Sequence, residues 1–262
     1  MANASINLGN GNWSVKESKL LGSRPIKDKI APIEFDVTRA STATRVNKQG
    51  LIETVNSNIA RIDYSNDANG SLLLEPQSTN LINYSEDFSQ SAWFNSKGRI
   101  IIGNNSIIAP NGTLTGTKLT STNENNAHYL RNGTASYSDG VTRTFSVFLK
   151  YGNENKNLTL SYLNKLLIVK FNANGILSHV SNTSQSYNIE EYESGWYKVS
   201  VTDTVSGGGF LYTGIQTENN QDGTSFFYIW GAQLEENSFS TSYISTLTGT
   251  TQTRSADTCG GA

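Results

Sequence analysis

Leu72-Leu-Leu-Glu-Pro-Gln-Ser-Thr-Asn-Leu-Ile-Asn-Tyr-Ser-Glu-Asp-Phe88, closed by Trp93, carries the clearest structural signals in the 262-residue chain. Its three consecutive leucines are typical of a strand covered on both faces. Pro76 ends that strand, because proline fixes φ and has no backbone donor. The Ser, Asn and Asp residues that follow favour turns, and Phe88 and Trp93 supply aromatic bulk. We expect this stretch to open the main folded domain.

Short alternating segments follow one another after this stretch. The clearest are residues 143–151, 157–163, 195–201 and 225–235, separated by turns rich in Gly, Asn and Asp. Alternation along a strand gives one buried and one wet face, and close spacing of such strands is typical of sandwiches. The sequence therefore predicts an all-β fold, an antiparallel β-sandwich of the jelly-roll type.

The part of the chain before this stretch is patterned more weakly. Residues 1–34 show no apolar period of 2 or 3.6, whereas residues 35–39 and 51–55 alternate on either side of the turn Asn47-Lys-Gln-Gly50 and predict a hairpin. We expect an extended N-terminal arm with short strands over residues 1–70 and the jelly roll over residues 71–262. Residues 1–34 cannot bury enough surface alone to offset their ordering entropy, so they must pack on their own domain or a neighbouring subunit.

Composition excludes several classes of protein. The net charge is −2 and no long basic run is present, which argues against nucleic-acid binding. No apolar stretch approaches the ~18 residues that span a bilayer, and the N-terminus lacks a signal-peptide pattern, so synthesis in the cytoplasm is expected. The single cysteine, Cys259, rules out a disulfide within the chain. We expect its thiol to lie in a flexible tail.

No catalytic constellation is visible. His128 and His179 are far apart and have no Cys or second His nearby, so they are expected to be polar surface or strand-edge residues. Carboxylates stand in groups at 86/87, 190/191/193 and 235/236, yet neighbours in a strand point to opposite faces. A glycosidase needs two carboxyl groups facing one cleft. The prediction is a non-enzymatic protein, with a polysaccharide hydrolase as the weakest alternative.

Two kinds of ligand site can be argued from the residues. Asp87 follows the first core strands and Glu235 closes the last one, and the first and last strands of a jelly roll lie close together. Their oxygens could hold Ca²⁺; the alternative, exposure or pairing with Lys or Arg, stays open. Trp196 and Trp230 are expected in the core. Exposed tyrosines can stack on sugar rings, and the candidates for glycan binding are Tyr129, Tyr162 and Tyr187.

Several segments together resemble a known family. They are residues 72–88 with Trp93, the segment 35–53, Gly195-Trp-Tyr-Lys-Val199, Trp230-Gly-Ala-Gln-Leu-Glu235 and residues 241–257. In this order they resemble the jelly-roll, carbohydrate-binding-module-like domain of tailed-bacteriophage head or tail fibre and spike proteins. The resemblance covers residues 35–257 and is more specific for a phage structural module than for one part of the virion.

The resemblance implies a function and partners. It implies a multimeric virion surface protein whose sandwich is similar to carbohydrate-binding modules, in which an ion often ties the first strand to the last. The chain lacks the long β-helical body of depolymerase spikes, so the resemblance carries no enzymatic activity. We expect a head or tail fibre subunit, a homotrimer, joined to other virion proteins through residues 1–34 and adhering to host-surface glycans. The alternative is a stand-alone glycan-binding module.

Overall fold

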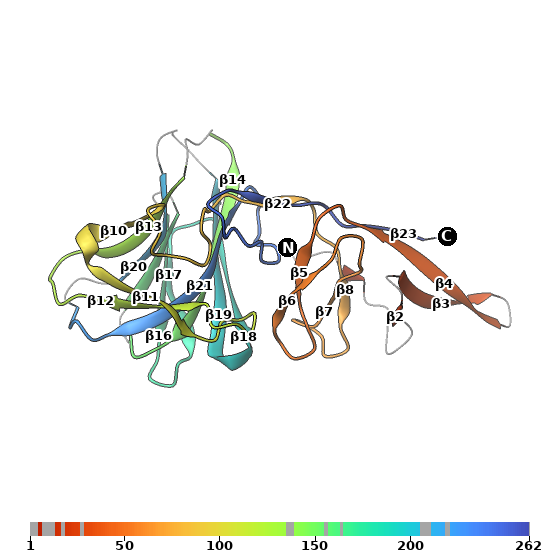
Figure 1. Cartoon of the computed structure of the whole chain (residues 1–262), viewed down its shortest axis with the longest axis horizontal. Helices are drawn as coiled ribbons and strands as arrows, with labels where there is room; N and C mark the ends of the chain where they lie inside the picture. Colours follow the sequence, from red (N-terminus) through yellow and green to blue (C-terminus); the bar gives the residue numbers. More distant parts are fainter. Residues whose placement is uncertain are drawn as a thin grey trace. The chain divides into compact units, whose positions relative to one another are not determined.

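Strands dominate the structure (Figure 1). The computed structural model describes residues 5–6, 14–16, 19–26, 29–134, 139–154, 157–162, 165–204, 211–217 and 221–261. Over these ranges the only helical elements are two short 3-10 turns, η1 (Ser96–Gly98) and η2 (Glu193–Gly195). No helix in the described part of the chain has the length and apolar character of a membrane span. The all-β prediction is confirmed.

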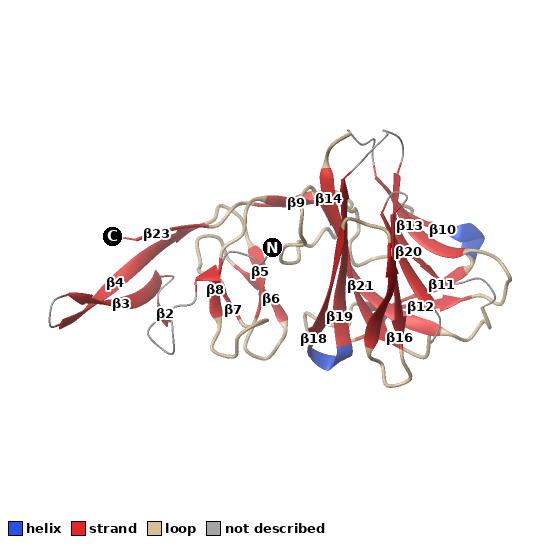
Figure 2. Ribbon diagram, turned by 180° about the vertical axis from the view of Figure 1, so that it is seen from behind, coloured by secondary structure: helices blue, strands red, loops and turns tan. Residues whose placement is uncertain are grey.

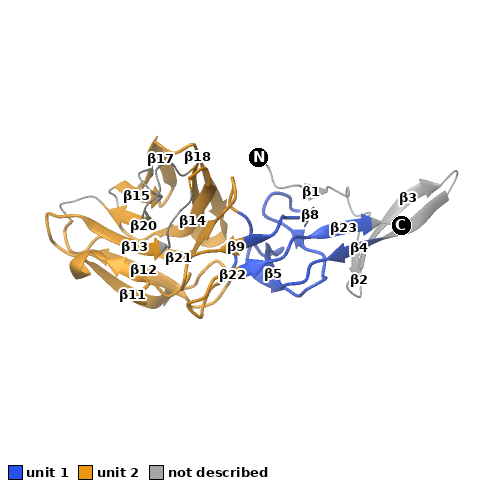
Figure 3. Cartoon of the chain, turned by 90° about the horizontal axis from the view of Figure 1, so that it is seen from above, with its two compact units in different colours: residues 1–78, 241–244, 253–262 blue, residues 79–240, 245–252 orange. Residues whose placement is uncertain are grey.

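The chain forms two compact units, coloured separately in Figure 3. The first unit comprises residues 1–78, 241–244 and 253–262, and the second comprises residues 79–240 and 245–252. This division differs from the predicted border between residues 70 and 71. The opening strand stays with the N-terminal part, and so do the last ten residues, because they pair with it and share its buried charges.

The first unit is built from small antiparallel sheets. One contains β1 (Ser5–Ile6), β8 (Ser71–Leu73) and β7 (Ile62–Asp63), in that order. A second contains β2 (Ser14–Lys16), β3 (Lys19–Ile26), β4 (Lys29–Thr38) and β23 (Thr258–Gly261). A third is the hairpin of β5 (Ala43–Val46) and β6 (Ile52–Val55). Strands β9 (Ser78–Asn80) and β22 (Gln252–Arg254), in which the chain passes from one unit to the other, form a separate two-stranded sheet.

This unit has a core of its own, which the description as an extended arm did not anticipate. Val37, Ala60, Ile62 and Leu72 are buried together in it. Cys259 packs against this core and pairs with Val37 across β23 and β4, so the expectation of a flexible tail is wrong for it. Burial raises the pKa of the Cys259 thiol, and the nearby Asp36 carboxylate raises it further.

The turn predicted at residues 47–50 and the strand after it are confirmed, but the strand that pairs with β6 is β5, whereas residues 35–38 belong to β4 and pair with β3 and β23. In the pairing of β5 with β6, Val46 lies opposite Ile52 next to the turn. Within the turn, the Gly50 amide donates to the Asn47 carbonyl oxygen at 2.9 Å. Gly50 takes a φ of 76°, which glycine adopts at no steric cost. Asn47 Oδ1 also accepts hydrogen bonds from the amides of Gln49 and Leu51, which stabilise the turn further.

The second unit is a sandwich of two six-stranded antiparallel sheets (Figure 2). The first, here called the β13 sheet, has the order β10 (Trp93–Asn95), β13 (His128–Thr134), β20 (Leu211–Thr217), β15 (Asn157–Tyr162), β16 (Lys165–Phe171), β17 (Leu177–Asn182). The second, the β14 sheet, has the order β11 (Ile100–Ile107), β12 (Gly116–Ser121), β21 (Phe226–Glu235), β14 (Thr142–Tyr151), β19 (Trp196–Thr204), β18 (Ser186–Tyr192).

The core of the sandwich lies between these sheets. Side chains that alternate inward from both fill it, and they are nearly all fully buried; from the β13 sheet they include Leu130, Leu160 and Val169, and from the β14 sheet Phe145, Val199 and Leu234. Burial of these apolar side chains away from water makes this core the main source of the unit's stability.

The opening stretch and the closing strand meet, as the sequence predicts. The Leu81 amide donates to the Leu234 carbonyl oxygen at 2.8 Å, and the Ala232 amide donates to that of Ser85 at 2.9 Å. The buried amide of Asn80 completes the join, accepting from the Leu234 amide and donating to the Ala232 carbonyl oxygen. The first and last segments of the sandwich are therefore held together by hydrogen bonds within the protein.

Much of the outer face of the β14 sheet is covered by the chain itself. Trp196 donates from Nε1 to the Ile108 carbonyl oxygen at 3.1 Å, and Trp230 donates to Thr115 Oγ1 at 3.0 Å. At another part of this face, Thr144 Oγ1 donates to the Asn237 carbonyl oxygen at 2.9 Å. Both tryptophans are buried, as predicted, but they lie on this outer face and not in the core between the sheets, where they were expected. An indole with its N–H satisfied in this way is a structural group.

Candidate functional site

The outer face of the β13 sheet presents aromatic and polar side chains to solvent. Trp93 and Leu130 point into the core, so by alternation Phe94, Tyr129 and Arg131 lie on the outer face. Strand register aligns Phe94 with Arg131 on neighbouring strands. Phe94 is 53% exposed, whereas Tyr129 and Arg131 are half-buried.

The row continues over two further strands. Gln216 on β20 lies opposite Tyr129, and Thr159 on β15 lies opposite Gln216. Both side chains are half-buried, while Ile215 beside Gln216 faces the core. The "β13-sheet row" is thus formed by Phe94, Tyr129, Arg131, Gln216 and Thr159. It places two rings at one end and hydrogen-bonding groups toward the middle of the sheet.

Contacts within the row fix its geometry. The rings of Phe94 and Tyr129 have centroids 6.0 Å apart and planes inclined by 33°. The Arg131 guanidinium carbon lies 4.0 Å from the centre of the Tyr129 ring, and Nη2 donates to Gln216 Oε1 at 3.2 Å. A guanidinium held over an aromatic face and by an amide loses little further freedom when it binds a ligand.

Gly214 contributes no side chain in the middle of this face. It pairs with Arg131 on one side and with Ser161 on the other. A Cβ at Gly214 would lie 2.1 Å from the Leu130 carbonyl oxygen, so no larger residue fits. In the described part of the structure, the buried atoms Arg131 Nε and Ser161 Oγ have no hydrogen-bond partner.

The chemistry of the row is that of binding. Flat rings offer apolar surface to the apolar face of a sugar, and guanidinium, amide and hydroxyl groups can hydrogen-bond its hydroxyls. None of the five side chains is a carboxylate, His or Cys, so the row holds no general acid or nucleophile of the kind that hydrolysis needs.

The three predicted tyrosines lie in different places. Tyr129 lies in the row. Tyr187 is 41% exposed but sits on the edge strand β18, where its ring stacks on His179 of the edge strand β17, with centroids 4.4 Å apart. Tyr162 ends β15, and its side chain lies outside the described residues. Of the two tyrosines whose side chains the structure describes, Tyr129 is the one that lies beside other ligand-binding groups.

The two histidines also differ. His179 lies exposed on the edge strand, as expected. His128 is fully buried instead, with Nε2 2.9 Å from the Thr122 carbonyl oxygen, so the surface expectation is wrong for it. It faces inward because it alternates with the outward-facing Tyr129 at the start of β13.

Asp87 and Glu235, the two predicted Ca²⁺ ligands, have different surroundings. Asp87 accepts hydrogen bonds from Ser89, Gln90 and Asn104, and these donors outweigh the effect of partial burial and lower its pKa. Glu235 is fully buried at the end of β21, in register with Thr144. Among the described residues no three His, Cys, Asp or Glu side chains are placed to hold a metal. The Ca²⁺ site stays a prediction.

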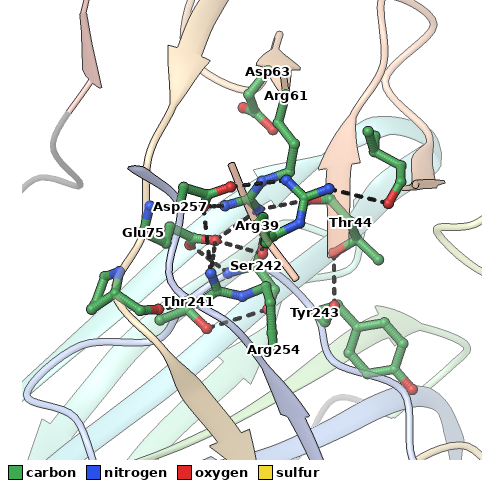
Figure 4. A network of polar contacts seen from close by, with 12 residues as sticks. Arg39, Thr44, Arg61, Asp63, Glu75, Thr241, Ser242, Tyr243, Arg254 and Asp257 are labelled. Atoms are coloured by element: carbon green, nitrogen blue, oxygen red, sulfur yellow. Dashed lines mark hydrogen bonds and ion pairs between the residues drawn. The ribbon is translucent and has the colours of Figure 1, made fainter. Parts of the chain in front are cut away.

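A buried charge network in the first unit was not anticipated (Figure 4). Its members are at most 1% exposed: Arg39, Arg61, Arg254, Glu75 and Asp257. Arg39 Nη1 lies 2.8 Å from Asp257 Oδ1, and Arg61 Nη1 lies 2.8 Å from Glu75 Oε2. Arg61 also pairs with Asp257, and Arg254 lies within 3.6 Å of both carboxylates.

Glu75 is ionised in this network despite its burial. Burial alone would raise the pKa of its carboxyl, but Arg254, Arg61 and two hydrogen bonds from Ser242 lower it below the ordinary value. Removing one partner would leave a buried charge uncompensated, which costs about 3–5 kcal/mol. The network joins residues from both ends of the sequence, and its role is structural.

One sequence signal could have revealed this network. Glu75 follows three leucines, and Arg61 stands between Ala60 and Ile62. A charged residue inside an apolar run is seldom solvated, and buried charges are paired. The signal identifies members of the network but not their partners.

Comparisons with known proteins give only distant likenesses. No family model and no curated protein matches the chain. The tailspike protein 4 enzymatically active domain of bacteriophage CBA120 is 11% identical with a TM-score of 0.38, over 59% of this chain and 21% of that one. The CBM22-1 xylan-binding domain of Paenibacillus barcinonensis Xyn10C is 12% identical with a TM-score of 0.35, over 60% and 90%.

A third likeness is to TmCBM27, a carbohydrate-binding module with specific mannan recognition. It is 14% identical with a TM-score of 0.31, over 63% of this chain and 98% of that one. This chain spans about a fifth of the tailspike chain and nearly all of the two binding modules. At these TM-scores the likenesses carry no argument about function, which must rest on the residues of the chain itself.

Proposed function

We propose that the second unit binds a carbohydrate through the β13-sheet row. The observation that carries this proposal is the pair of the exposed Phe94 and the half-buried Tyr129, with Arg131 held against Tyr129 on the outer face of the β13 sheet. Stacking and polar groups lie side by side there, as sugar recognition requires. A net charge of −2 disfavours nucleic acid as the ligand.

A binding measurement on the full chain tests this proposal. A glycan array should show binding of at least one glycan. Tyr129→Ala should then weaken that binding about tenfold or more, since one aromatic contact is worth ~1–3 kcal/mol. Ile176→Ala is the control, because Ile176 is an exposed apolar residue that lies outside the row.

Two results would contradict the proposal. One is an array on which the assembled protein binds nothing. The other is a bound glycan whose affinity is the same for wild type and Tyr129→Ala, provided both melt at the same temperature. A loss of affinity in the Ile176→Ala control would point to a general effect on folding.

We further propose that the chain is a non-enzymatic structural subunit of a bacteriophage virion, a head or tail fibre or spike displayed on the virion surface. The sequence resemblance over residues 35–257 supports this proposal. Residues 1–34 would join it to other virion proteins. Phage carrying a chain without residues 1–34 should form particles that lack this protein, and its continued incorporation would contradict the attachment role.

Oligomeric state and activity are tested separately. The mass of the purified protein in solution should be three times that of one chain if the subunit is a homotrimer. Incubation with host polysaccharide should release no reducing sugar. Released sugar would favour the alternative of a polysaccharide hydrolase.

A further inference from the structure

A second row of side chains crosses the outer face of the β14 sheet. Tyr228 on β21 lies in register with Lys118 on β12 and with Lys150 on β14. Phe227 and Leu149, one position along, are core residues, so the three side chains point outward. All three are half-buried. They form an alternating Lys–Tyr–Lys row over three neighbouring strands.

Phe226 adds a second ring beside this row. Its ring and that of Tyr228 have centroids 5.5 Å apart at an angle of 81°. Lys118 Nζ lies 3.8 Å from the centre of the Phe226 ring, and Lys150 Nζ donates to the Ser194 carbonyl oxygen at 2.6 Å. Each ammonium group is therefore positioned by a specific contact on one side of Tyr228.

Neither lysine has an anionic partner among the residues that the structure describes. No Asp or Glu oxygen of those residues lies within 4.0 Å of Lys118 Nζ or Lys150 Nζ, whereas surface cations such as Arg45 and Arg99 are ion-paired. Burial lowers the pKa of Lys150, which shows that its charge is incompletely solvated. An anion placed between the two lysines would compensate both charges.

We propose that this row binds an acidic polysaccharide, with a sugar ring on Tyr228 and sugar carboxylates on Lys118 and Lys150. The lysines lie two strand spacings apart, about 10 Å between backbones, so acidic groups on different sugars of one chain can reach both. The aromatic pair favours a pyranose over an isolated phosphate, which offers no apolar face. This site is separate from the β13-sheet row and does not depend on it.

Affinity electrophoresis of the full chain in polygalacturonate tests the inference. Wild type should be retarded, and the double variant Lys118→Gln/Lys150→Gln should bind about tenfold more weakly, because two charge-assisted contacts are lost. Raising NaCl from about 0.05 M to about 0.5 M should also weaken binding of the wild type. Lys48→Gln is the matched control, since Lys48 is exposed in the β5–β6 turn.

The aromatic part of the site needs its own variants. Tyr228→Ala should weaken binding to polygalacturonate, whereas Tyr187→Ala, which removes an exposed ring outside both rows, should leave it unchanged. An equal loss of binding in the two variants would show that the effect does not come from the Lys–Tyr–Lys row. All variants should melt at the wild-type temperature. If Tyr228→Ala melts lower, Tyr228→Leu is used in its place, because leucine keeps apolar bulk without the ring.

Three results would overturn the inference. The first is a wild type that polygalacturonate does not retard. The second is a double lysine variant that binds as tightly as Lys48→Gln. The third is competition by duplex DNA that equals competition by polygalacturonate, which would mean attraction of any polyanion without recognition of a sugar.

Discussion

Glu75 shows how one residue can be specified by residues far away in the sequence. It follows Leu72-Leu-Leu74 and is buried like Leu72 and Leu73, yet it carries a charge because Arg61 and Arg254 lie beside it. Ser242 adds two hydrogen bonds. Such a carboxylate contributes little while its partners are intact and becomes costly to the fold when one of them is lost.

The variant Glu75→Gln should therefore destabilise the first unit by about 3–5 kcal/mol, because the arginines lose a counter-charge without leaving the interior. Hydrogen exchange in β5–β8 measures this change. Glu53→Gln, which breaks the exposed Arg45–Glu53 pair, is the control and should cost under ~1 kcal/mol. Equal effects of the two variants would show that burial of the network contributes nothing.

Acid should destabilise the first unit by protonating the Glu75 carboxylate. Its folded pKa lies below the ordinary 4.5, so its stabilising contribution is fully present above the unfolded pKa and is lost as pH falls through the folded value. Stability of the first unit should thus decline below about pH 4.5 in wild type. Glu75→Gln should show a flatter profile there, and parallel profiles would exclude Glu75 as the titrating group.

The residue scale also shows how far sequence reasoning reached. Burial of Trp196 and Trp230 was predictable because each lies in an alternating strand, and Tyr129 was predictable as a ring in a polar strand. Phe94 and Arg131 were missed. Their roles depend on the pairing of β10 with β13 and on the Gln216 contact, which join residues up to 85 positions apart.

At the scale of elements, strands with strong alternation were located closely. Residues 143–151 and 225–235 correspond to β14 (Thr142–Tyr151) and β21 (Phe226–Glu235). Strands β3 and β4, by contrast, lie mostly in a segment that shows no apolar period. Part of what orders β4 is its pairing with β23, more than 200 residues later. A local pattern cannot contain that information.

The join of β13 and β20 gives a prediction at this scale. Gly214→Ala should push the two strands apart, because its Cβ would meet the Leu130 carbonyl oxygen. We expect a loss of about 1–3 kcal/mol in the stability of the sandwich, with a lower melting temperature and weaker binding at the β13-sheet row. Gly260→Ala, which meets nothing within 4 Å, is the control. An unchanged melting temperature in Gly214→Ala would contradict the tight pairing.

At the scale of the whole molecule, the two units are not consecutive along the chain. The sandwich is inserted between residue 78 and the C-terminal segments that complete the first unit. Sequence reasoning placed one border near residue 70 but could not assign residues 253–262, since Arg39 and Asp257 are 218 positions apart. A change in composition along the sequence can mark the border between two consecutive domains. It cannot mark the borders of a unit that is built from several separate segments.

Truncation tests this organisation. A chain ending at residue 252 should keep a folded sandwich but lose the first unit, because Arg254, Asp257 and β23 are missing. A chain ending at residue 257 keeps the charge network and should retain most of the protection of β5–β8 against hydrogen exchange. The first unit would be independent of its C-terminal segments if both truncated chains behaved like wild type.

The charge network also sets an order of events during synthesis. Glu75 and Asp257 are 182 residues apart, and a ribosome adding about 5–20 residues per second needs about 10–35 s to make that stretch. The inserted sandwich is synthesised during this interval. Arg39 and Arg61 therefore have no Asp257 carboxylate to pair with until the sandwich has been made. A nascent chain that stops early therefore leaves the ribosome with its first unit unfinished, and proteases can distinguish it from a complete subunit.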